Sequence, residues 1–104
     1  ELLEHGFEEV ALPDPGREIH GVYIGDLLSW VMGRAQADNA WITIMSNVNV
    51  IAVASLADTA AVILSEGVEL DEALVNQAEM KGINVLSTDL PSYEAAVKLY
   101  ELMR

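Results

Sequence analysis

Three short apolar runs in the second half of the chain constrain its fold more than any other feature. They are Trp41–Met45, Ala60–Leu64 and Ile83–Leu86, and a segment of helix length follows each one. Apolar strands without polar alternation are typical of a sheet that is buried on both faces, and strand–helix alternation is typical of parallel connections. The pattern therefore predicts a three-layer α/β/α fold with a mostly parallel sheet of four or five short strands, joined by right-handed crossovers.

Local signals place the helices between and after these runs. Ser46-Asn47 offers capping side chains before a helix over 48–57, which we expect despite its valines because tertiary burial overrides helix propensity. A second helix over 71–81 begins with acidic residues and stops at Gly82. The last helix is predicted over 92–102, where apolar residues recur at helical spacing.

The first third of the chain predicts smaller elements. Residues 1–5 are interpreted as the end of a helix, and 7–12 as a short strand. The turn chemistry of 13–16, Pro-Asp-Pro-Gly, separates it from a second strand over 19–24. Asp26 then stands at the expected start of a helix, where a carboxylate favours the positive end of the helix dipole.

Composition indicates one globular domain over 1–104 and narrows its partners. The chain has 104 residues, of which 5 are Lys or Arg and 17 are Asp or Glu, giving a net charge of −12. Nucleic acids and anionic membranes select for basic surfaces, so neither is expected as a partner. Cysteine is absent and no apolar run reaches bilayer length, so a cytoplasmic location is expected. The chain begins at Glu1 rather than Met, so we expect either a fragment of a longer protein or a trimmed form of this one.

The helix over 48–57 is apolar almost all round, since only Asn49 and Ser55 interrupt it. A surface helix in a small domain normally has a polar face, so this helix needs cover on more than one side. One interpretation is self-association, with the helix forming the interface of a homodimer. The alternative is that the first helix or the N-terminal segment covers it. The interface predicted by the first interpretation consists of Val48, Val50, Ile51, Val53 and Ala54.

No motif in the sequence indicates catalysis, a cofactor or a metal ion. The phosphate-binding patterns G-x-x-x-x-G-K-[ST] and G-x-G-x-x-G are absent, and so is the G-x-S-x-G nucleophile motif. The only histidines, His5 and His20, do not have metal-ligand spacing. The acids around 66–72 lack the calcium-loop pattern and suit the first turn of a helix. We therefore predict no catalytic residues, no cofactor and no metal site.

The architecture itself predicts a candidate ligand site. Open parallel sheets bind ligands at the carboxyl ends of their strands, where polar side chains and helix N-termini meet. A small polar ligand there would use hydroxyl, amide and glycine groups, although the same residue types also serve as plain helix caps. The candidate residues are Ser46, Asn47, Ser65, Gly67, Ser87 and Thr88.

Four segments carry a resemblance to a known family. Two of them, 61–71 and 78–88, contain a strand, a Ser-Glu-Gly turn and the sequence Gly-Ile-Asn-Val-Leu-Ser-Thr. The others are 21–29 and 92–96. Together they resemble the DRTGG domain, which is similar to the N-terminal domain of HPr kinase/phosphorylase. The chain departs from the family name, because Ser46-Asn47-Val48 stands near the Asp-Arg-Thr part and one glycine of the Thr-Gly-Gly turn remains.

The resemblance implies an α/β regulatory or accessory module, found alone or fused to enzymes such as CBS-containing pyrophosphatases, that often assembles as a dimer. The kinase activity of the related proteins lies in a separate P-loop domain, so it is not implied here. We therefore expect a non-catalytic regulatory module that homodimerises and mediates protein interactions. The alternative is a sensor of a small nucleotide-like metabolite at the strand ends.

Overall fold

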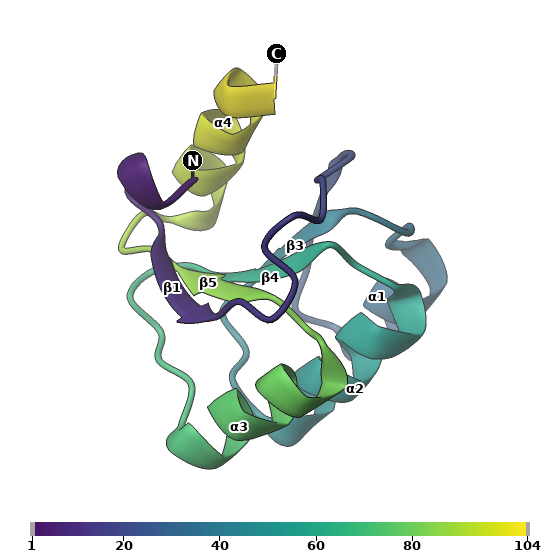
Figure 1. The fold of residues 1–104 in the computed structure, drawn as a ribbon. Coiled ribbons are helices and arrows are strands. Elements are labelled where there is room, and N and C mark those ends of the chain that lie inside the picture. The colour runs from purple at the N-terminus through teal and green to yellow at the C-terminus, as the bar shows by residue number, and fades with distance from the viewer. Residues whose placement is uncertain (1, 104) are drawn as a thin grey trace.

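The chain forms a five-stranded sheet in the order β1-β5-β4-β3-β2, in which β2 to β5 are parallel and β1 is antiparallel to β5 (Figure 1). The structure is a computed structural model that describes residues 2–103. The strands are β1 Glu8–Ala11, β2 Val22–Ile24, β3 Ala40–Thr43, β4 Ala61–Leu64 and β5 Val85–Ser87. The predicted three-layer α/β/α fold with a mostly parallel sheet of short strands is confirmed.

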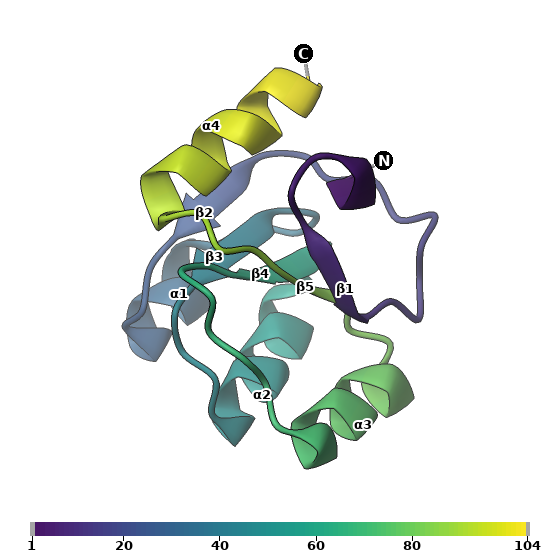
Figure 2. The same ribbon diagram turned by 90° about the vertical axis from the view of Figure 1, so that its left-hand side faces the viewer.

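The two helical layers are unequal, as Figure 2 shows. One face of the sheet carries three helices, α1 Leu28–Arg34, α2 Val48–Ala57 and α3 Glu72–Lys81, and the other carries only α4 Ser92–Met103. Successive strands from β2 to β5 step across the sheet in one direction, so crossovers of a single hand place their helices on one face. No helix in residues 2–103 is long and apolar enough to cross a bilayer.

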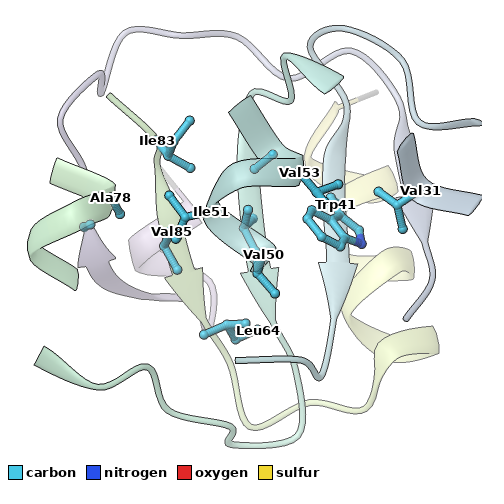
Figure 3. Close-up of a cluster of buried hydrophobic side chains, with 12 residues drawn as sticks. Val31, Trp41, Val50, Ile51, Val53, Leu64, Ala78, Ile83 and Val85 are labelled. Carbon is cyan, nitrogen blue, oxygen red and sulfur yellow. The ribbon is translucent and has the colours of Figure 1, made fainter. Parts of the chain in front are cut away.

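Alternating side chains of the strands form two cores. Trp41 of β3 and Val62 of β4 face the three-helix layer, whereas Ile42 and Ile63 face α4. Figure 3 shows the first core, where Trp41 lies beside side chains of α2. The indole Nε1 of Trp41 donates a hydrogen bond of 2.9 Å to the carbonyl of Gly25, so its buried polar atom is satisfied.

Local capping explains why α2 and α3 begin and end as predicted. The Asn47 side chain accepts a hydrogen bond from the Asn49 amide at the start of α2. The Asp71 carboxylate accepts one from the Leu74 amide before α3, and Gly82 ends α3 with a φ of 74°. A left-handed residue at that position favours glycine, which has no side chain to clash with the backbone.

The first third of the chain differs from the prediction in three places. Only Val22–Ile24 of the expected strand over 19–24 joins the sheet. Helix α1 begins without a side-chain cap, because the Asp26 carboxylate accepts hydrogen bonds from the Thr43 hydroxyl and the Ile44 amide instead. The predicted helix end over 1–5 is a single 3-10 turn, η1 Leu2–Glu4, and Glu1 lies outside the described residues.

Helix α2 is covered within the chain, which corrects the predicted dimer interface. It packs between α1 and α3, so α1 covers one side, as the alternative interpretation allowed, while α3 covers the other. A second copy cannot contact the buried members of the predicted set while the domain is folded. The buried members are Val50, Ile51, Val53 and Ala54, and Val48 is the exposed one.

Candidate functional site at the carboxyl ends of the strands

The six predicted ligand residues fall into separate groups in the structure. Ser46 and Asn47 lie after β3 at the start of α2, where the Asn47 Oδ1 accepts a 2.9 Å hydrogen bond from the Asn49 amide. This bond is an ordinary helix cap. Of the other four, Ser65 and Gly67 follow β4, whereas Ser87 ends β5 and Thr88 follows it, at the neighbouring part of the sheet edge.

Two of those four side chains hold the structure together. The Ser65 hydroxyl is buried and lies 2.8 Å from the hydroxyl of Ser92, the first residue of α4. The buried Thr88 Oγ1 accepts a hydrogen bond from the Leu90 amide in the turn that leads to α4. Their hydroxyl groups therefore help to position the start of α4, as the capping alternative expects.

The turn after β4 is locked by its own backbone. Glu66 and Gly67 have φ values of 60° and 74°, and their amides donate to the carbonyls of Leu90 and Thr88. A Cβ atom added to Gly67 would lie 3.2 Å from the Asp89 carboxylate, which is a tight contact. The amides of this turn are used within the fold, so they do not form a phosphate-binding nest.

A hollow of about 650 Å³, here called the strand-end hollow, lies beside this turn. Gly67, Ser87 and Thr88 of the predicted set line it, together with residues of the η1–β1 segment and of α4. The structure thus brings half of the predicted residues to one concave surface, and a hollow of this size falls in the usual range for small-ligand sites.

The charged groups around the strand-end hollow are of both signs. Glu8, Glu69 and Asp89 contribute carboxylates, while the half-buried Lys98 of α4 contributes an ammonium group. His5 adds an imidazole. Within residues 2–103, no three acidic or histidine side chains are grouped closely enough to hold a metal ion. The hollow therefore presents one permanent cation to a ligand among three acids.

Sequence reasoning missed the charged groups of the hollow because they come from distant elements. Glu8 reaches it because β1 pairs with β5 in an antiparallel register that places Glu8 opposite Ser87. Lys98 reaches it because α4 runs back over the sheet after β5 (Figure 2). The scarcity of lysine was the one available signal, since the chain has only Lys81 and Lys98.

The fold and the strand-end hollow define a small α/β domain with a parallel sheet and a concave surface at its carboxyl edge. The sequence pattern of the DRTGG domain matches residues 16–102, and the chain belongs to this family. No curated protein matches it significantly.

A solved structure with the same fold covers the CBS and DRTGG domains of the regulatory region of Clostridium perfringens pyrophosphatase, complexed with its activator diadenosine tetraphosphate. The two share 14% sequence identity with a TM-score of 0.75 over 89% of this chain, which spans 41% of that solved chain.

Proposed function

We propose that this domain is a non-catalytic regulatory module that senses a small nucleotide-like metabolite in the strand-end hollow. The observation that carries the proposal is the position of the hollow over the carboxyl ends of β4 and β5, with Lys98 in its lining. Ligands of open parallel sheets bind at this edge. The nucleotide class is supported by the regulatory region of the clostridial pyrophosphatase, whose activator is a dinucleotide.

The charges of the strand-end hollow determine which charge state of a nucleotide can bind there. Lys98 attracts a phosphate group, whereas Glu8, Glu69 and Asp89 repel it. A nucleotide would therefore bind with Mg²⁺ on its phosphates, or with few phosphate charges. Because the turn amides are committed to Leu90 and Thr88, the phosphate contact depends on the Lys98 side chain.

Isothermal titration calorimetry with AMP, ATP and diadenosine tetraphosphate, each with and without Mg²⁺, tests this proposal. We expect at least one of these ligands to bind the unmodified domain, and Lys98→Gln to weaken its binding by about 10- to 100-fold, as loss of a charge-assisted hydrogen bond does. Lys81→Gln is the matched control, because Lys81 is an exposed lysine in the last turn of α3, outside the lining.

Two results would overturn the sensor proposal. If none of the three nucleotides binds under either condition, the domain does not sense this class of ligand. If Lys98→Gln and Lys81→Gln weaken binding equally, net charge rather than the strand-end hollow governs the affinity.

Homodimerisation is the second candidate function, and the outer face of α4 favours it. Tyr93 and Tyr100 are 76% and 64% exposed, and with Val97 they form one stripe at i, i+4 and i+7. In an antiparallel pair of α4 helices, the Tyr93 of one copy would lie opposite the Tyr100 of the other. The stripe is therefore self-complementary, as a two-fold interface requires.

Light scattering coupled to size-exclusion chromatography tests the dimer. We expect the unmodified domain to have the mass of a dimer, Val97→Glu to have that of a monomer, and Leu56→Glu to remain dimeric, since Leu56 is 72% exposed on the remote helix α2. Glu94 and Glu101 flank the stripe, so added salt should strengthen the dimer by screening their repulsion. A monomeric unmodified domain would contradict homodimerisation and leave a different protein as the partner of this face.

A further inference from the structure

A second hollow, of about 830 Å³, lies at the opposite edge of the sheet, near the amino ends of β2 and β4. It is here called the loop hollow, because the loop over 12–21 forms one of its walls. It exists because α4 contacts β2 and β3, and a helix about 10 Å wide covers only about two strands spaced about 4.8 Å apart. The loop and Leu3 of η1 lie beside the part of β4 and β5 that α4 leaves open.

Asn84 fixes this loop to the sheet. Its side chain is almost fully buried, at 5% exposure for the residue, just before β5. The Oδ1 atom accepts a 2.9 Å hydrogen bond from the Asp14 amide, and Nδ2 donates to the carbonyls of Asp14 and Ala60 at 2.8 and 3.1 Å. One carboxamide therefore satisfies both peptide groups of Asp14, so the wall is held in a defined position.

Arg17 anchors the middle of the loop. Its Nη2 atom donates to the carboxylates of Asp38 and Asp58 at 2.8 and 3.0 Å, and to the Asp58 carbonyl at 2.7 Å. The hydrogen bond to Asp38, supported by Asp58, raises the pKa of the Arg17 guanidinium above its ordinary value. Because the loop is anchored at Asp14 and at Arg17, its wall of the hollow is held in place before any ligand arrives, which reduces the entropic cost of binding.

The chemistry of the loop hollow differs from that of the strand-end hollow. Its lining is mostly apolar, with Ile19 in the loop, Leu86 in β5 and Leu102 in α4. The charge of Arg17 is already balanced by two carboxylates, and the chain as a whole has a net charge of −12, so an anion gains little here. Among residues 2–103, the hydrogen bonds of the guanidinium use Nε and Nη2 and not Nη1, and Arg17 lines the hollow.

We propose that the loop hollow binds an uncharged, largely apolar small molecule that carries a hydrogen-bond acceptor for Arg17. This site does not depend on the nucleotide proposal, because it shares only Leu3 with the lining of the strand-end hollow. Ring compounds with one carbonyl group are the simplest members of this class.

Two probes of nearly the same shape test the proposal by their charge: benzamide is neutral and benzoate is anionic. Amide chemical shifts of the ¹⁵N-labelled domain are followed during each titration. We expect benzamide to shift the amides of Ile19, Leu86 and Leu102 with a Kd on the order of 1 mM, and benzoate to bind at least about 5-fold more weakly.

Variants locate the binding. Leu102→Lys places a charge in the lining and should weaken benzamide binding at least about 10-fold, whereas Leu56→Lys, the same change on the exposed face of α2, should leave it unchanged. If Leu102→Lys does not fold, Ile19→Ser in the loop replaces it, with at least about 3-fold weakening expected. The proposal is overturned if benzamide shifts none of these amides, if benzoate binds as tightly, or if the folded lining variant binds unchanged.

Discussion

Replacing Asn84 should destabilise the domain more than replacing any exposed polar residue. The Asn84→Leu substitution removes three hydrogen bonds, two to Asp14 and one to Ala60. Each hydrogen bond contributes about 1 kcal/mol, and the buried carbonyl of Ala60, which loses the Asn84 donor, costs about 1 kcal/mol more. The total loss in the free energy of unfolding is then about 4 kcal/mol. Burial of the leucine side chain offsets part of this, so we expect a free energy of unfolding lower by about 3 kcal/mol.

The assay is urea unfolding followed by circular dichroism, with a thermal melt as a second measure. A loss of about 3 kcal/mol corresponds to a midpoint lower by about 12 °C or more in a domain near this size. Asn76→Leu on α3 is the matched control, because Asn76 is exposed and should change stability by less than about 0.5 kcal/mol.

The isosteric variant Asn84→Asp adds a test in which the direction of the change in stability with pH is defined. Its carboxylate would face the carbonyl oxygens of Asp14 and Ala60, which raises the pKa of the new side chain in the folded state above its unfolded value. The protonated form, which can donate to one carbonyl, therefore contributes stability at low pH that is lost as pH rises through the folded pKa.

Relative to the unmodified domain, Asn84→Asp should be less destabilised at about pH 5 than at about pH 7.5. The unmodified domain measured at both pH values removes the contribution of the other carboxylates. An Asn84→Leu variant within about 1 kcal/mol of the unmodified domain would refute the reasoning, because three hydrogen bonds of an almost fully buried side chain cannot be worth so little together. So would a pH-independent difference for Asn84→Asp.

Four further substitutions test other parts of the fold. Arg17→Met removes a partly exposed ion-pair network and should lower the free energy of unfolding by about 1–2 kcal/mol in urea titrations. Glu66→Gly should raise the melting temperature by an amount equivalent to about 0.5–1 kcal/mol, because the φ of 60° at Glu66 strains a residue that has a side chain. A lower melting temperature would contradict this backbone strain. Val50→Asp should unfold the domain, whereas Val48→Asp should cost less than about 1 kcal/mol, as circular dichroism will show.

Elements with complete local signals could be predicted from the sequence. Helix α2 begins after Asn47 and helix α3 lies between Asp71 and Gly82, as expected, because one capping side chain or one glycine decides each end. The parallel sheet followed from apolar runs that separate segments of helix length, since few topologies bury such strands on both faces. These features depend on residues that are close together in the sequence.

The features that could not be predicted depend on contacts across the chain. Asp26 was expected to serve a helix start, but the Thr43 hydroxyl, 17 positions away, binds its carboxylate. The apolar face of α2 was interpreted as an interface, because a sequence does not show that α1 and α3 flank this helix. Asn84 and Asp14 are 70 positions apart, so no local pattern indicates that they hold the loop hollow.

Capping at the strand ends determines how the candidate site can recognise an anion. In dinucleotide-binding folds a helix N-terminus directly after a strand receives the phosphate. Here residues 65–71 separate β4 from α3, and the Asp71 carboxylate already accepts the Leu74 amide that would face an anion. Among residues 2–103, Lys98 on α4 is the one permanent cation that lines the strand-end hollow. Recognition of a phosphate there must therefore weaken with ionic strength, as a side-chain contact partly open to solvent does.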